Sequence, residues 1–230
     1  MYSISFNGKN CLQYGILPVR RPDIPAAEKE VEEITIPGRD GILTESKERY
    51  LPVVISIEFN FMKEPDEWAG AFRKAKKWLQ GSGNLEFSDD AHYLYKVYYC
   101  KITDSERTSR KIGKFTAEFT CYPYLFVRDG QREKTIEEIK RNPYCISHPL
   151  YKITGEGLCR ININGKEVSV NVGQNVTIDT ERMIAYRTDG TIQNTVVTGE
   201  YEDLYLQEGD NEILVTDGFE ISVIPNWRVL

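Results

Sequence analysis

Hydrophobic residues in the first half of the chain recur at every second position, which is the spacing of strands with one buried face. The clearest stretch covers residues 113–121, where Phe115, Ala117 and Phe119 share one face. Residues 53–61 and 93–102 are rich in β-branched and aromatic side chains, which favour strands. Proline cannot continue a central strand, so Tyr-Pro-Tyr at 122–124 is expected to end this series.

One segment between these strands has helical spacing instead. Its apolar stripe consists of Trp68, Phe72, Ala75 and Leu79. Asp66 is expected to cap the helix and Gly81 to end it. The C-terminal half also carries four cations, namely Arg73, Lys74, Lys76 and Lys77. No aromatic or glycine pattern accompanies them, so a solvated helix face is favoured over a nucleic-acid surface.

Short apolar segments separated by turns fill the second half, after a polar linker at 128–149. We expect strands at 151–154, 158–163, 167–172, 176–179, 183–187, 203–206, 211–215 and 219–224. Asn-Gly or Asp-Gly pairs at 164–165, 189–190 and 217–218 favour hairpin turns between several of them. Eight short strands without a helix predict an antiparallel sandwich.

Residues 36–43 combine two turn signals. Pro37-Gly38 is the pair that a type II turn prefers, and Asp40-Gly41 suits a primed hairpin turn. Arg39 stands between them, and apolar residues flank the segment on both sides. The pattern predicts a hairpin tip that displays a paired charge, although an ordinary surface turn has the same local chemistry.

Composition and charge point to two domains with different neighbours. The chain has 230 residues, of which 40% are hydrophobic and 28% charged, as in ordinary globular proteins. Residues 1–141 have a net charge of +1, whereas residues 142–230 have a net charge of −7. The acidic half argues against a nucleic-acid surface there, and the near-neutral half permits self-association. The start does not resemble a signal peptide, and five scattered cysteines without a CxxC pair suit a reducing cytosol.

Candidate catalytic and metal-binding chemistry is sparse. His92 follows Asp89-Asp90, which reads more simply as a turn before a strand than as a metal cluster. Cys145 and His148 form a single C-x-x-H without a second pair, which is weak evidence for zinc. The sequence has no P-loop, dinucleotide fingerprint, G-x-S-x-G or H-E-x-x-H. Nothing in these motifs indicates an enzyme.

The order of several segments resembles that of phage distal tail proteins, which occur in siphophages and prophages of Gram-positive bacteria. In the first half these are residues 5–8, the turn at 37–41, the helix ending Trp78-Leu79, residues 85–90 and residues 113–124. Residues 149–157, 161–165, 176–179, 209–213 and 221–228 are similar to the outer domain of that family. No single motif is specific, but the shared order covers nearly the whole chain.

The resemblance implies a mainly β fold, with an α+β ring domain over residues 1–147 that contains one helix. A galectin-like antiparallel β-sandwich would follow over residues 148–230. It also implies a homo-hexameric ring at the virion tail tip, assembled in the host cytoplasm. This ring would join the tail tube protein to a fibre or receptor-binding protein, and the genome would pass through its channel. The resemblance implies no catalytic residue, cofactor or metal, and no membrane or nucleic-acid surface. The candidate interface with a neighbouring subunit or the tube consists of Pro37, Gly38, Arg39, Asp40 and Gly41.

Two other functions remain as alternatives. An all-β second half also suits a cell-surface carbohydrate-binding adhesin. Sugar-binding galectins use a histidine, asparagine and arginine cluster beside an exposed tryptophan. The only histidine of this half is His148, at its edge, and its only tryptophan is Trp227, in the terminal strand. Host-glycan binding is therefore disfavoured. A tail-associated hydrolase is motivated only by the plentiful carboxylates.

Overall fold

The structure, a computed structural model, describes residues 1–103 and 105–230. It divides into two compact units, Met1–Leu125 with Leu230, and Phe126–Val229. The sequence placed the boundary at 147/148 instead. The difference arises because the segment before residue 147 packs into the second unit: Ile139 is fully buried in its core, and β11 (Lys134–Thr135) pairs with β19 (Glu220–Ile224).

The first unit is built on an antiparallel sheet with the strand order β2-β1-β7-β8-β10-β6-β3. Its elements are β1 (Ile4–Phe6), β2 (Lys9–Asn10), η1 (Cys11–Tyr14), β3 (Ile16–Pro18), β6 (Val53–Met62), β7 (Gly83–Phe87), β8 (Tyr93–Ile102), β9 (Glu106–Arg107) and β10 (Ile112–Val127). β6 and β10 pair continuously from Ile112↔Met62 to Cys121↔Val53. The predicted face of Phe115, Ala117 and Phe119 is buried, which confirms that alternation.

Proline 123 does not end its strand, so the predicted end at 122–124 was wrong. β10 continues through Pro123 to Val127. The ladder with β6 stops at Cys121, so no amide donor to β6 is required at Pro123.

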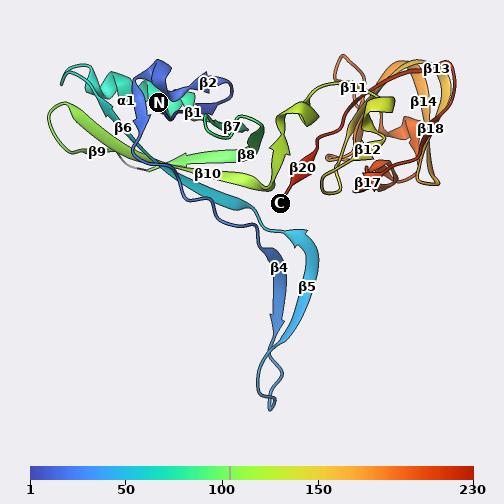
Figure 1. Ribbon diagram of the computed structural model, residues 1–230, viewed down its shortest axis with the longest axis horizontal. Coiled ribbons are helices and arrows are strands. Elements are labelled where there is room, and N and C mark those ends of the chain that lie inside the picture. Colours follow the sequence, from blue (N-terminus) through green and yellow to red (C-terminus); the bar gives the residue numbers. More distant parts are fainter. Residues whose placement is uncertain (104) are drawn as a thin grey trace. The chain divides into compact units, whose positions relative to one another are not determined.

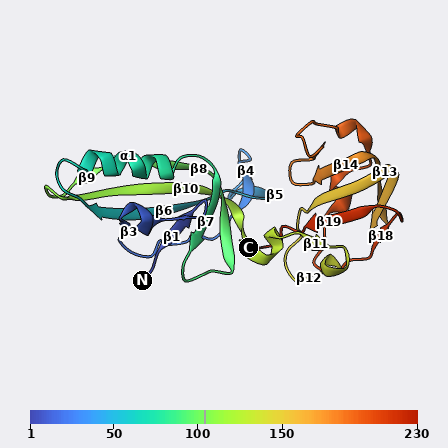
Figure 2. The same ribbon diagram turned by 90° about the horizontal axis from the view of Figure 1, so that it is seen from above.

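The predicted helix is α1 (Trp68–Trp78), which covers one face of this sheet (Figure 2). Phe72, Ala75 and Trp78 are buried in the same core as the strands, and Leu79 is buried as the C-terminal cap. The predicted Asp66 cap was wrong. Glu67 occupies the cap with helical backbone angles and no side-chain bond, because a turn from Glu64 to Glu67 leads directly into the helix. Gly81 follows with a φ of +96°.

Aromatic rings fill the space between α1 and the sheet. Phe115 lies 5.4 Å from Phe59 and 5.5 Å from Phe72, measured between ring centroids. The Trp78 indole N–H donates to the Phe6 carbonyl at 3.3 Å, which satisfies its polar atom inside the core. A Cβ on Gly113 would lie 2.5 Å from Phe61, so this position requires glycine for steric reasons.

The second unit is organised by one long antiparallel hairpin. It contains β11, η2 (Arg128–Gln131), η3 (Glu137–Ile139), β12 (Arg141–Asn142), β13 (Leu150–Ile163), β14 (Lys166–Asp179), β15 (Ile184–Tyr186), η4 (Asn194–Val196), β16 (Val197–Thr198), η5 (Tyr201–Leu204), β17 (Gly209–Asp210), β18 (Ile213–Val215), β19 and β20 (Arg228–Val229). β13 and β14 pair along their full lengths. Asn164 and Gly165 both have positive φ, which confirms the predicted primed turn between them.

Several predicted short strands are merged in this hairpin. Residues 151–154 and 158–163 form one strand, β13, and residues 167–172 and 176–179 form β14. In the sequence, Gly155 and Gly157 interrupt the apolar pattern. In the structure both have positive φ, and the ladder between β13 and β14 continues through them. The two ends of β13 pair with different strands, β19 and β18, so the sheet curls around its core.

Two further expectations for the second unit fail. Residues 203–206 are not a strand, since η5 occupies 201–204. The turn at Asp217-Gly218 does not join paired strands, because β18 and β19 both pair with β13. Asp189-Gly190 does form a turn, in which the Gly190 N–H donates to the Arg187 carbonyl at 2.8 Å. Among the described residues, no helix has the length and apolarity to cross a membrane.

Candidate assembly surfaces

The hairpin of β4 (Lys29–Ile34) and β5 (Leu43–Tyr50) is a long and mostly exposed element of the first unit. The two strands form a separate sheet and a ribbon of their own (Figure 1). At the base of the hairpin, the Leu51 N–H donates to the Glu28 carbonyl at 2.8 Å. An irregularity near Glu30 sets three residues of β5 against one of β4. The hairpin therefore leaves most of its surface for another molecule or for solvent.

One face of this hairpin combines apolar and charged side chains. Ile34 lies opposite Leu43, and the next pair on the same face is Glu32 opposite Glu45. Ile34 and Leu43 are 37% and 46% exposed, so both aliphatic side chains of this cross-strand pair reach solvent. We call Ile34 and Leu43 the apolar pair, and Glu32 and Glu45 the carboxylate pair. In the sequence, the apolar residues stand out only as flanks of a turn, because charged residues hide the alternation.

Cations gather toward the base of the same face. Lys47 lies 3.4 Å from carboxylate oxygens of both Glu30 and Glu32, and Arg49 bonds to Glu30. The hydrogen bond from Arg49, followed by that from Lys47, holds the pKa of Glu30 below its usual value. The charge of the hairpin is thus neutralised at its base, while its distal half, toward the tip, stays acidic and apolar.

The tip contains the five residues predicted as an interface. The Arg39 N–H donates to the Ile36 carbonyl at 3.2 Å and Gly38 has a φ of +81°, which confirms the type II turn at Pro37-Gly38. The primed turn at Asp40-Gly41 was wrong, because Gly41 has positive φ but Asp40 does not. All five residues are exposed. Within the described chain, no ion pair joins Arg39 to Asp40, so the tip carries two separate solvated charges instead of the expected pair.

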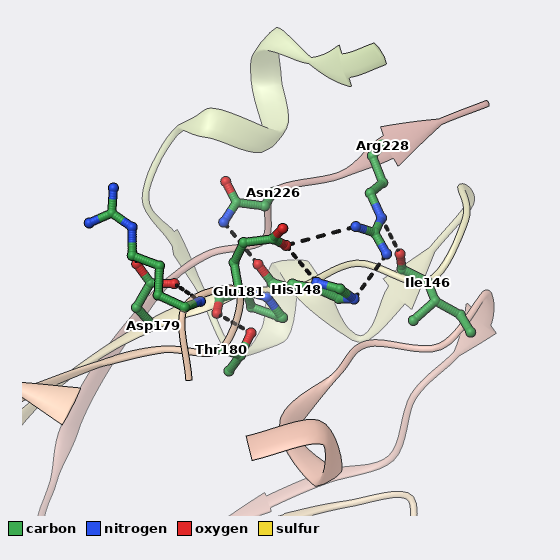
Figure 3. A network of polar contacts seen from close by, with 9 residues as sticks. Ile146, His148, Asp179, Thr180, Glu181, Asn226 and Arg228 are labelled. Atoms are coloured by element: carbon green, nitrogen blue, oxygen red, sulfur yellow. Dashed lines mark hydrogen bonds and ion pairs between the residues drawn. The ribbon is translucent and has the colours of Figure 1, made fainter. Parts of the chain in front are cut away.

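A second polar cluster lies in the second unit and centres on His148 (Figure 3). Its Nδ1 is 2.5 Å from a Glu181 carboxylate oxygen, and Arg228 approaches its Nε2 at 2.9 Å. The guanidinium can only donate, so Nε2 accepts and the imidazole proton lies on Nδ1, toward Glu181. Arg228 also donates to the Ile146 carbonyl at 2.6 Å, and the Asn226 amide donates to the His148 carbonyl.

This cluster holds parts of the second unit together. It connects the residues before β13, the end of β14 and the C-terminal strand β20, and the His148 ring stacks on Tyr205 at 4.0 Å. Arg228 is 7% exposed, so the contacts form in a largely dry environment. Both imidazole nitrogens have protein partners, which gives the histidine of the C-x-x-H motif a structural role.

The other candidate metal residues are not brought together. Asp89 pairs with Arg21 at 2.8 Å, and the Asp90 carbonyl accepts from the Tyr93 N–H in the turn that opens β8. His92 is exposed beside them. In the described part of the chain, no three His, Cys, Asp or Glu residues are grouped closely enough to hold a metal ion.

The comparisons with known proteins identify a shared fold. No protein-family model matches the chain, and no curated protein matches its sequence. Among solved structures, the chain is similar to the Dit protein (gp 19.1) of phage SPP1. That crystal structure is described as a paradigm of the hub adsorption apparatus in phages that infect Gram-positive bacteria. The TM-score is 0.68 at 13% identity, and the match covers 97% of this chain and 98% of that one. An identity this low establishes likeness of fold alone.

Proposed function

We propose that this chain is a structural subunit of a phage tail tip, a distal tail protein that forms the hub of the adsorption apparatus. The observation that carries this proposal is the fold likeness to the SPP1 hub protein, which extends over nearly the full length of both chains. A match of both units in their order is more informative than a match of one common β-domain.

In this proposal, six copies form a ring through their first units, with a central channel for the genome. The near-neutral charge of residues 1–141 supports such packing, because copies would not repel one another strongly. The acidic second unit would take a galectin-like sandwich form and lie on the outer rim. The ring would join the tail tube protein to a fibre or receptor-binding protein.

The exposed hairpin supports a role in assembly. A chain working alone gains nothing by exposing the apolar pair, whereas burial against a partner would stabilise the assembly. We assign the tip residues Pro37, Gly38, Arg39, Asp40 and Gly41 to a contact with a neighbouring copy or the tail tube. Such a hub works through interfaces, so we propose no catalytic activity and no cofactor for it.

Native mass spectrometry and negative-stain imaging of the purified chain, alone and with its tail tube partner, test the proposal. We expect a six-fold ring with an open channel. A chain that remains monomeric under both conditions, or that binds a glycan array strongly through its second unit, would contradict it and favour the adhesin.

A further inference from the structure

A hollow of ≈ 650 Å³ lies beside the C-terminal half of α1 in the first unit. Its lining residues are Arg73, Lys76, Lys77, Gln80, Cys100 and Ile102. The last two come from β8 and are only partly buried, so they give the hollow an apolar floor. The three cations come from the exposed face of α1 and form its rim. This combination suits a ligand with both an apolar and an anionic part.

The rim charges lack anionic partners within the described chain. Arg73, Lys76 and Lys77 take part in no ion pair there, and Lys76 instead lies 4.5 Å from the centre of the Phe72 ring. Arg73 and Lys77 are four residues apart, which places their Cβ atoms about 5–6 Å from each other. Like charges at this spacing destabilise a helix, so the isolated chain keeps a repulsion that an anionic partner would remove.

The distal half of the β4–β5 hairpin presents the complementary pattern. The two carboxylates of the carboxylate pair are directly opposed, an arrangement that is unfavourable unless a cation lies nearby. Lys47 reaches Glu32 at 3.4 Å, but in the described chain no ion pair reaches Glu45. Their Cβ atoms are about 4.5–5.5 Å apart, close to the spacing of Arg73 and Lys77. The apolar pair follows them on the same face.

We propose that the distal half of this hairpin in one copy docks into the α1 hollow of a second copy. The apolar pair would cover Cys100 and Ile102, and the carboxylate pair would face Arg73 and Lys77. The contact joins two different surfaces, so each copy would receive one hairpin and donate one, which generates a ring when the rotation closes. This inference rests on the proposed function in one respect, namely that the assembly is built from copies of this chain.

A charge-reversal experiment tests the docking. The intact chain is compared with the variants Arg73→Glu/Lys77→Glu and Glu32→Lys/Glu45→Lys and with the combination of all four changes. Self-association is measured by sedimentation velocity at two salt concentrations. Each double variant should weaken self-association at least about tenfold, and the combination should recover most of the loss because the charge pairs are restored with opposite sense. Higher salt should weaken the wild-type contact.

A matched control separates this contact from a general effect of net charge. Lys9→Glu/Lys114→Glu reverses two exposed lysines elsewhere in the first unit and lowers the net charge by the same amount as Arg73→Glu/Lys77→Glu. Circular dichroism verifies that every variant is folded. The control should associate as the wild type does. An equal loss in the control, or no recovery in the combined variant, overturns the docking.

The remaining outcomes are equally decisive. A six-fold ring that persists in Arg73→Glu/Lys77→Glu overturns the docking while the proposed hub function stands. A wild-type chain that stays monomeric at its highest soluble concentration also overturns it. Binding of a short oligonucleotide that disappears only with the α1 changes would reassign the hollow to a nucleic acid.

Discussion

Replacing Gly113 with alanine should destabilise the first unit by overfilling its aromatic core. A Cβ built at this position lies 2.5 Å from Cζ of Phe61 and 2.8 Å from Cζ2 of Trp68. Both atoms belong to rigid rings, and Phe61 is 3% exposed, so it cannot swing into solvent. The centroids of the two rings are 5.3 Å apart, and Phe61 also packs on Phe115. The methyl group must therefore displace packed rings.

The expected cost is about 1–3 kcal/mol, the usual range for an overpacked core. For a unit of this size, about 4 °C of melting temperature corresponds to 1 kcal/mol, so the midpoint should fall by roughly 4–12 °C. Differential scanning calorimetry of the full chain measures this, and the transition of the second unit provides an internal reference. Gly113→Ala combined with Phe61→Leu should recover part of the loss, since leucine removes the clashing ring atoms.

Gly70→Ala is the matched control with the opposite expected sign. Gly70 lies inside α1, and a Cβ there meets nothing within 4 Å. Alanine should raise the melting temperature through a helix-propensity gain of up to about 1 kcal/mol. If Gly113→Ala melts at the wild-type temperature, or if both variants shift in the same direction, the steric argument is refuted.

Three further results are expected. Arg228→Ala should destabilise the second unit by about 2–3 kcal/mol because it removes charged hydrogen bonds from a buried cluster; an unchanged calorimetric transition of that unit would contradict this. Burial raises the pKa of Tyr95 to about 12, and Asp90 makes a smaller contribution. Burial also raises the pKa of Cys121 to about 12, with a smaller contribution from Cys100. Their contribution to stability should be complete below about pH 9 and lost as the pH rises toward 12, which urea titrations across this range would measure; stability that increases with pH would reverse the sign. Burial, with a smaller contribution from the charge of Glu118, also raises the pKa of Cys100 to about 12. Cys100 and Cys121 should therefore resist a thiol reagent at pH 8, whereas the urea-unfolded chain should react fully. Rapid labelling of these two cysteines in the folded chain, located by peptide mass, would contradict this.

Local signals in the sequence predicted the features that depend on a few neighbouring residues. Alternation placed Phe115, Ala117 and Phe119 on one buried face. The turns at Pro37-Gly38 and Asn164-Gly165 followed from the φ values that these residues permit. In each case, the preference of the local chain agrees with the surrounding packing.

Predictions from neighbouring residues were wrong where contacts with distant segments decide the structure. Pro123 lies within a strand because the ladder with β6 has already ended, a fact set by the length of β6. The cap is Glu67 and not the predicted Asp66, because the turn before the helix fixes where α1 begins. Gly155 and Gly157 broke the apolar pattern, but the opposite strand β14 keeps β13 continuous.

For the β4–β5 hairpin and the hollow beside α1, the sequence likewise predicted local features but not the arrangement of charges. The sequence indicated the turn at its tip, and it marked the basic face of α1 as solvated. Neither pattern revealed that Glu32 faces Glu45, because the register of the hairpin decides which side chains are opposed. Likewise, the hollow beside α1 exists only where the helix and β8 meet across the first unit.

The sequence by itself therefore determined the mainly β composition, the single amphipathic helix and the turns whose geometry is encoded in two adjacent residues. Only the tertiary structure decided the unit boundary, the continuous β13–β14 hairpin and the pairing of charges on the exposed surfaces. The physical reason is that backbone preferences act over a few residues, whereas strand partners and register depend on contacts between segments far apart in the chain.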